Sequence, residues 1–241
     1  YVTTRAGLLG KAGSDVVTAA YYSIHPDFIK ASYEHLLLVG SIEDAIQIRD
    51  EAVLYGLRKY APDICEELGS MAEDLWEAAD SLPVSGRLLF ASQLRHRRHD
   101  EPVLNAWLAV NCIREWRGDT HWALQIEDGL SGVESGVLDG AWRNYGDDWL
   151  PRSRGADDAL LADAYSKLEE RGFVKDGKVN DAGIAHRIML EEKLDKAAVL
   201  AWQYLGEERT TRFVELVDSV GDELMRRIDE TAGKKWMPAG R

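Results

Sequence analysis

The strongest local signals for the fold lie in the stretch Leu168-Glu169-Glu170-Arg171-Gly172-Phe173-Val174-Lys175-Asp176-Gly177-Lys178-Val179-Asn180-Asp181-Ala182-Gly183. A helix is expected to end at Gly172, because glycine readily takes the left-handed conformation that follows many helices. Phe173-Val174 and Lys178-Val179 are typical of two very short strands, since the Asp176-Gly177 pair between them favours a tight turn. Asn180 and Asp181 then favour a new helix. The stretch predicts helix, hairpin, helix.

Two more helices are expected just before the hairpin. Residues 159–171 place Leu161, Ala164 and Leu168 on one apolar face at helical spacing. Further upstream, Ser131 is followed three residues later by Glu134, which is the pattern of a capping box at a helix start. Residues 146–155 between these helices are rich in turn-forming residues. The order of elements is helix, turn, helix, wing and helix.

This order resembles a winged-helix unit, and the text of the wing resembles that of MarR-type regulators. The resemblance covers about 60 to 90 residues, from the Gly129-Leu130-Ser131-Gly132-Val133-Glu134 block to Gly183. It implies that residues 159–171 occupy the place of the recognition helix. A fold of this kind supports many functions, so the resemblance by itself does not assign one.

The rest of the chain is expected to be helical. Pro26 favours a helix start, Ser41 with Asp44 favours another, and Pro62 a third. A helix from Pro102 to about Ile126 carries apolar residues around most of its circumference, as expected for burial on several sides. We therefore expect a mainly α protein, with an N-terminal helical domain (1–100) packed on a MarR-like winged-helix domain with a two-strand wing (101–200), and a long C-terminal helix and tail (201–241).

The C-terminal helix is expected to present an apolar stripe. The stripe consists of Phe213, Leu216, Val217, Val220, Leu224 and Ile228. It is long enough to pair two copies of the chain, so a homodimer is predicted. The alternative is that the stripe packs on the chain's own N-terminal helices.

Composition restricts the class of protein. The chain has 29 basic and 42 acidic residues, a net charge of −13, and both 1–100 and 101–241 are acidic. No apolar stretch approaches the roughly 20 residues that cross a bilayer, so no membrane partner is expected. Cys65 and Cys112 lie in apolar helical contexts without metal-ligand spacing, which indicates reduced thiols and a cytoplasmic location. The sequence begins at Tyr1 without methionine, so a natural N-terminal segment is expected to precede it.

A wider resemblance covers nearly the whole chain. It rests on these blocks: Arg5-Ala6-Gly7, Tyr22-Ser23-Ile24-His25-Pro26, Gly86-Arg87-Leu88-Leu89-Phe90-Ala91, Asp100-Glu101-Pro102, Arg114-Glu115-Trp116-Arg117-Gly118-Asp119-Thr120-His121 and Gly129-Leu130-Ser131-Gly132. They look like an actinobacterial family of largely uncharacterised helical proteins with a MarR-like half. Thr120 replaces a glycine of the family pattern, and the basic run at 95–99 departs from it. The resemblance implies no settled activity.

The charge of the recognition segment argues against DNA. Residues 151–183 hold six basic and seven acidic residues, so counterion release on a phosphate backbone would contribute little. DNA binding is therefore expected to be unlikely. A ligand-responsive MarR-type regulator is kept as an alternative.

Polar residues embedded in apolar helices favour a small-molecule pocket between the two halves instead, since ligand sites combine apolar walls with a few polar groups. The proposed ligand-binding residues are Arg5, Tyr22, Asn111, Arg114, Arg117 and Trp142. His25, Asp119 and His121 are candidates for acid–base catalysis, with Asp119 orienting a histidine. They also suit a metal, although no motif specifies one and no cofactor is indicated. The alternative to all of these is an internal ion-pair network.

The run Leu94-Arg95-His96-Arg97-Arg98-His99-Asp100 is the densest basic segment of the chain. It precedes Pro102 and is expected to form a loop. Two interpretations are open: a solvated loop, or a clamp for phosphate or carboxylate.

Overall fold

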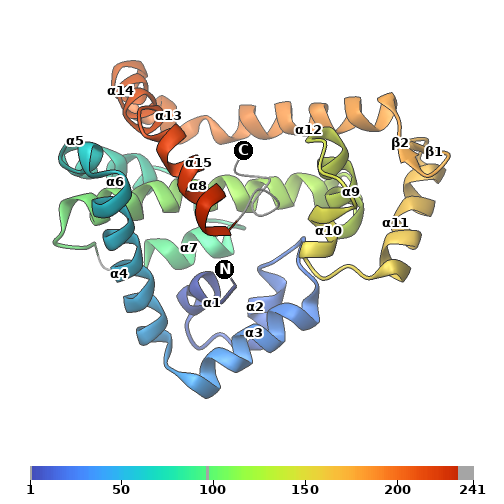
Figure 1. Ribbon diagram of the computed structural model, residues 1–241, viewed down its shortest axis with the longest axis horizontal. Helices are drawn as coiled ribbons and strands as arrows, with labels where there is room; N and C mark the ends of the chain where they lie inside the picture. Colours follow the sequence, from blue (N-terminus) through green and yellow to red (C-terminus); the bar gives the residue numbers. More distant parts are fainter. Residues whose placement is uncertain (1, 96–97, 233–241) are drawn as a thin grey trace.

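A long central helix, α8 (Pro102–Glu127), organises the fold in the computed structural model, which describes residues 2–95 and 98–232 (Figure 1). The expected helix start at Pro102 is confirmed, since proline at the first turn loses no hydrogen bond. Fourteen of its residues are buried, on several sides of the helix. Four helices pack along it: α5 (Cys65–Ser70), α6 (Ala72–Asp80), α7 (Leu88–Leu94) and α12 (Asp181–Ala198).

The N-terminal helices form a group on one side of the molecule (Figure 1). They are α1 (Val2–Ala6), the 3-10 turn η1 (Gly7–Leu9), α2 (Ser14–Ala19), α3 (Pro26–Val39) and α4 (Ile42–Tyr60). In this group α4 packs on α8, and the other helices pack on one another and on α4. His25 caps α3, because its Nδ1 accepts from the backbone N–H of Asp27 at 3.3 Å. Ser41 and Asp44 form the expected capping box at the start of α4.

The next group builds the largest hydrophobic core. It contains the 3-10 turn η2 (Pro62–Ile64), α5 (Cys65–Ser70), α6 (Ala72–Asp80) and α7 (Leu88–Leu94). Its apolar faces join those of α8 and α13 around fully buried Leu75 and Phe90. Cys112 lies in this core and Cys65 at its edge, both as free thiols.

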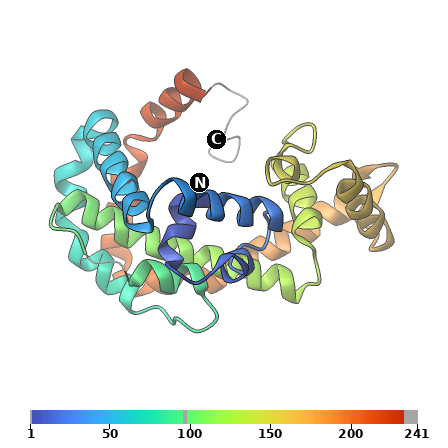
Figure 2. The same cartoon turned by 90° about the horizontal axis from the view of Figure 1, so that it is seen from below.

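The hairpin and its flanking helices form at the other end of the molecule (Figures 1 and 2). The elements are α9 (Gly132–Trp142), α10 (Trp149–Ser153), α11 (Asp158–Glu170), β1 (Val174–Lys175), β2 (Lys178–Val179) and α12 (Asp181–Ala198). The two strands are antiparallel, with Val174 opposite Val179. The turn residues Asp176 and Gly177 both have positive φ, as the sequence predicts for this pair. We call these elements, residues 132–198, the hairpin-bearing unit. A separate small core lies inside it, around Leu138 and Leu168.

The C-terminal segment differs from the expected single long helix. It is divided into α13 (Leu200–Leu205), α14 (Glu207–Asp218) and α15 (Gly221–Ala232). The last break falls at Ser219 and Val220. The helix before it, α14, packs on α5, whereas the helix after it, α15, packs on α4. Gly221, a weak helix former, starts α15.

The apolar stripe of these last helices is used inside the chain. Val220 is buried, and Phe213, Leu216 and Leu224 pack against the largest core. The reason for expecting a dimer, a free stripe, is therefore removed. Within the described part of the chain, no helix is long and apolar enough to cross a membrane. The domain boundaries at residues 100 and 200 stay a prediction.

Candidate functional site

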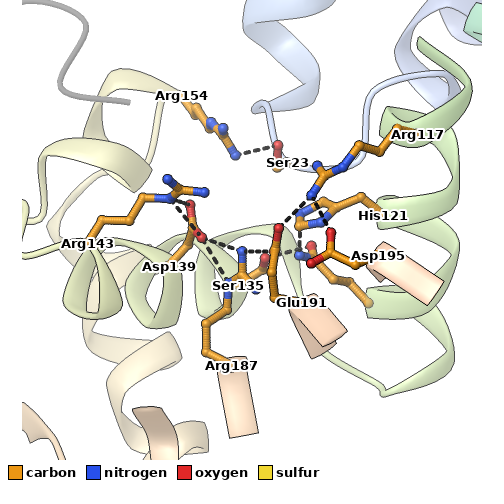
Figure 3. Close-up of polar contacts among 11 residues, drawn as sticks. Ser23, Arg117, His121, Ser135, Asp139, Arg143, Arg154, Arg187, Glu191 and Asp195 are labelled. Atoms are coloured by element: carbon orange, nitrogen blue, oxygen red, sulfur yellow. Dashed lines mark hydrogen bonds and ion pairs between the residues drawn. The ribbon is translucent and has the colours of Figure 1, made fainter. Parts of the chain in front are cut away.

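A buried ion-pair network joins α8, α9 and α12 (Figure 3). At its centre lies Arg187, whose side chain is 2% exposed. Its Nε donates to Oδ1 of Asp139 at 2.8 Å, and its Nη2 donates to Oε2 of Glu191 at 2.7 Å. The guanidinium also lies 4.5 Å from the ring centroid of Trp142. A buried cation of this kind is tolerated only because two carboxylates and an aromatic face surround it.

Two further arginines extend the junction network, which we define as Arg117, Asp139, Arg143, Arg187, Glu191 and Asp195. Arg117 of α8 donates to Glu191 at 2.5 Å and to Asp195 at 3.3 Å. Arg143, which follows the last residue of α9, contacts Asp139 at 3.3 Å. Each carboxylate of Asp139 and Glu191 thus serves two arginines, which ties the hairpin-bearing unit to the central helix.

His121 lies beside this network on α8. Ser135 donates to Oε1 of Gln125 at 2.6 Å, so the Gln125 amide nitrogen is the group 2.5 Å from Nε2 of His121. His121 therefore accepts at Nε2 and carries its proton on Nδ1. Burial, followed by the positive charge of Arg187, lowers the pKa of His121 to about 4. The ring is neutral at physiological pH.

A second polar cluster lies between α1 and the middle of α8. Glu115 is completely buried and accepts from Nε of Arg5 at 2.9 Å. Arg114 donates to the same carboxylate at 2.7 Å and to Oδ1 of Asn111 at 3.0 Å. Arg5 also lies over the rings of Tyr21 and Trp122. These contacts hold α1 on α8, as the internal ion-pair alternative predicts.

Asp119 points to α7 rather than to either histidine. It accepts from the backbone N–H of Phe90 at 2.9 Å. Burial raises its pKa to about 6, although the Phe90 hydrogen bond acts in the opposite direction. Asp119 anchors the start of α7.

The third site is a cavity of about 220 Å³ between the α2–α3 loop and the hairpin-bearing unit. Tyr22 and His25 are among the residues that line it. We call it the interface cavity; its other walls come from the starts of α9 and α11 and from α10. The Tyr22 hydroxyl donates to the carbonyl of Leu130. Arg154 donates from Nη1 to Ser23 at 2.7 Å (Figure 3). The backbone carbonyl of Arg154 accepts from the His25 N–H at 2.8 Å. The loop and the unit are thus closely joined.

The nine predicted site residues therefore do not meet in one centre. Arg117 belongs to the junction network, and His121 and Trp142 lie beside it. Arg5, Asn111 and Arg114 belong to the α1–α8 cluster, whereas Tyr22 and His25 line the interface cavity. Asp119 is hydrogen-bonded to α7 instead. His25, Asp119 and His121 have different neighbours and form no acid–base unit. No group of three potential metal ligands occurs among the residues that the structure describes.

Sequence reasoning missed the residues that hold these clusters together. Asp139, Arg187 and Glu191 were not selected, although Arg187 and Glu191 have the i, i+4 spacing of a helix ion pair, whereas Glu115 was expected only as a possible partner of Arg114 or Arg117 in the ion-pair alternative. The sequence signal that could have identified Arg187 is a charged residue on the face of α12 that packs against α8 and α9.

The hairpin-bearing unit presents an exposed face of α11 next to the hairpin. On α11, Leu161, Ala164 and Leu168 face the core, which leaves the opposite side of the helix exposed. Lys175 and Lys178 are exposed at the hairpin next to it. In a helix-turn-helix unit with such a hairpin, the exposed helix and the hairpin, which is called the wing, lie on the same side of the unit.

A family model described as a helix-turn-helix family matches residues 1–230. The chain belongs to this family. Comparison with curated proteins and with solved structures gave no significant match. The helix-turn-helix assignment overturns the expectation that DNA is an unlikely partner, because the motif is built to place a helix in the major groove.

The error came from counting charges along the sequence. In this helix-turn-helix protein, two acids of the counted segment are paired with bases of the same segment, so the count does not show where the unpaired positive charges lie. Asp163 accepts from Lys167 at 2.7 Å, and Arg152 lies 2.8 Å from Asp158. The two hairpin lysines have no acidic partner among the described ion pairs.

Proposed function

We propose that this protein binds duplex DNA through α11 and the hairpin. The observation that carries the proposal is a helix-turn-helix assignment over residues 1–230 combined with an exposed α11 face beside Lys175 and Lys178. α11 would enter the major groove, and the hairpin lysines would contact phosphates next to it. The free thiols of Cys65 and Cys112 are in line with a cytoplasmic location. The MarR-type and actinobacterial resemblance stays a prediction.

The electrostatics favour binding that depends on a few contacts. The chain carries a net charge of −13, so long-range attraction to DNA is absent. Local contacts from Lys175 and Lys178 would have to position the helix, and base contacts from the α11 face would add specificity. We expect a shallow dependence on salt, because few phosphates are neutralised.

The test is selection from a pool of randomised duplex DNA, followed by fluorescence anisotropy on the enriched sequence. The double variant K175E/K178E should weaken binding at least tenfold and reduce the salt slope by about one per lysine. The matched control is K11E/K30E, which makes the same charge change at exposed positions on the N-terminal segment. Failure to enrich any sequence, or equal losses in both variants, would contradict the proposal.

The interface cavity supports a second role, a small-molecule effector site. It lies between the α2–α3 loop and α9–α11, so a guest there would contact both. Its walls are mostly apolar, with the polar groups of His25, Ser23 and Arg154 at the edge. An occupant that favours one position of α11 would change DNA affinity. The check is a ligand screen by thermal shift, repeated on Ala156→Trp, which should remove any hit that binds in this cavity.

A further inference from the structure

The basic run of residues 94–100 is a charged segment that the proposed function does not use. Residues 96 and 97 of the run lie outside the described residues. Arg98 pairs with Asp80 and lies 4.6 Å from the ring centroid of Trp76. This arginine is therefore already paired within the chain, and the choice between a solvated loop and a clamp stays a prediction.

Another charged group lies at the end of α8, where Asp128 follows the last residue of the helix. A negative charge at this position is locally unfavourable, because the C-terminal end of a helix carries the negative end of the helix dipole. Asp128 is nonetheless largely buried, with 13% of its side chain exposed. A carboxylate in such surroundings is stable only if the rest of the fold supplies donors to it.

Two donors from the hairpin-bearing unit meet one oxygen of this carboxylate. Nη2 of Arg171, which follows the last residue of α11, donates to Oδ2 of Asp128 at 2.8 Å. Nε2 of His186, on α12, lies 2.8 Å from the same oxygen. An ionised carboxylate only accepts, so His186 donates from Nε2. Because Asp128 precedes the unit in the chain, these two bonds connect the unit to the end of α8.

Both donors also contact Phe173, the residue that starts the hairpin. The rings of Phe173 and His186 are stacked, with centroids 4.4 Å apart and 25° between their planes. The guanidinium of Arg171 lies 5.1 Å from the centroid of the Phe173 ring. The backbone carbonyl of Phe173 accepts from the N–H of Asn180 at 2.9 Å, which joins the two ends of the hairpin. The start of the hairpin is therefore held by the two side chains that Asp128 binds.

The hairpin lysines follow directly from this point. Lys175 is two residues after Phe173, and Lys178 lies opposite Lys175 in the two-strand sheet. The junction network acts elsewhere, because its six residues lie on or next to α8, α9 and α12 and none is on α11 or in the hairpin. A movement of Phe173 would therefore change where both lysines lie relative to α11.

We propose that Asp128 is a positioning residue for DNA binding: through Arg171 and His186 it fixes the hairpin so that its lysines lie beside α11. The inference rests on the proposed function, because it concerns how the hairpin lysines meet phosphates. A carboxylate repels phosphate, so Asp128 acts through its partners and not by contact with DNA. On charge alone, removal of Asp128 would strengthen DNA binding. Weaker binding after its removal therefore reports the loss of positioning.

The first experiment compares Asp128→Ala with Glu127→Ala by fluorescence anisotropy on the enriched duplex. Both changes remove one acid at the same end of α8, but Glu127 is exposed. Asp128→Ala should weaken binding at least fivefold, whereas Glu127→Ala should change it by less than twofold. Asp128→Asn keeps an oxygen that can accept from both donors, so it should retain most of the affinity. Equal or tighter binding by Asp128→Ala would overturn the proposal.

A double-mutant cycle shows whether the loss passes through the hairpin lysines. In the K175E/K178E background, Asp128→Ala should weaken binding by less than a further twofold, because the lysines no longer contribute. The same fivefold loss in both backgrounds would mean that Asp128 does not act by positioning these lysines.

Amide hydrogen exchange of the free chain tests the anchor without DNA. Asp128→Ala should speed exchange in residues 173–179 at least tenfold relative to α6 in the largest core. His186→Phe keeps a ring to stack on Phe173 but lacks the donor, and should speed it at least threefold. A wild-type chain that binds no duplex DNA would contradict the proposed function and this inference with it. A wild type that binds DNA, with unchanged hairpin exchange in both variants, would overturn this inference alone.

Discussion

Arg187 of α12 and Asp139 of α9 are joined by a hydrogen bond of 2.8 Å, although 48 residues separate them in the chain. The arginine is almost fully buried, and the same guanidinium reaches Glu191 on its own helix. Because Glu191 also accepts from Arg117 of α8, a continuous series of ion pairs connects the central helix α8 to α12 and α9 of the hairpin-bearing unit. The position of α11 relative to the rest of the molecule rests on this connection.

Replacing Arg187 by methionine should therefore destabilise the fold strongly. The change keeps the apolar stem but leaves Asp139 and Glu191 close together without their shared cation. Loss of one partner of a buried pair costs about 3–5 kcal/mol. Urea unfolding measures the loss. Arg226→Met, which removes a solvent-exposed arginine paired with Glu223 and Glu230, is the control and should cost less than about 1 kcal/mol.

Glu115→Gln should weaken the attachment of α1. The substitution keeps the size of a completely buried side chain but removes the charge shared by Arg5 and Arg114. We expect a loss of about 2–4 kcal/mol in the free energy of unfolding, and faster amide exchange in residues 2–9. Glu127→Gln, an exposed change on the same helix, should be neutral. Unchanged exchange in α1 would show that this cluster does not hold it.

Gly132→Ala should disturb the contact between the α2–α3 loop and α9. A Cβ at Gly132 would lie 2.6 Å from the carbonyl oxygen of Tyr22, a backbone atom that cannot move alone. We expect a loss of about 2–4 kcal/mol in thermal or urea unfolding. Gly140→Ala, in the same helix, meets only Leu150 at 3.8 Å and should stabilise by up to about 1 kcal/mol. Similar effects of the two changes would contradict the close approach.

His121 predicts a specific loss of stability in mild acid. Its pKa is about 4 in the folded chain against 6.5 for a free histidine, so the unfolded chain takes up a proton first as the pH falls. Stability from the neutral ring is complete above pH 6.5 and is lost between pH 6.5 and 4, by up to about 3 kcal/mol. The charged groups around it are Arg117, Asp139, Arg187 and Glu191.

The measurement is urea unfolding of wild type and His121→Gln at several pH values. The difference between the two should change across this window and be flat from pH 7 to 8. The buried carboxyl group of Asp119 has the opposite effect on stability. Because its pKa is about 6 in the folded chain, the free energy of unfolding falls as the pH rises from 4 to 6. Asp119→Asn should remove that penalty. A difference between wild type and His121→Gln that does not depend on pH would show that the pKa of His121 is the same in the folded and the unfolded chain.

Local sequence signals identified the elements of this protein well. Ser41 with Asp44, Ser131 with Glu134, Pro26, Pro102 and the Asp176-Gly177 turn all act where the sequence indicates. Each of these signals works between residues within a few positions of one another, so no tertiary information is needed to interpret it. The order of helices around the hairpin, and with it the winged-helix resemblance, followed from them.

The grouping of the polar residues was beyond those signals. Arg5 pairs with Glu115, Arg187 with Asp139, and Arg117 with Glu191, each across at least 48 residues. Helical spacing shows that Arg114 and His121 share a face of α8, but not which helix packs there. The net charge of −13 likewise gave no account of which acids were already paired with arginine or lysine.

The sequence by itself determined the helices, their caps and the hairpin, because these depend on backbone propensity and on hydrogen bonds between near neighbours. Only the tertiary structure decided which charges are buried together, and that the C-terminal stripe packs on the chain's own core. Burial changes the free energy of a charge far more than sequence context does, and burial exists only once distant helices have packed.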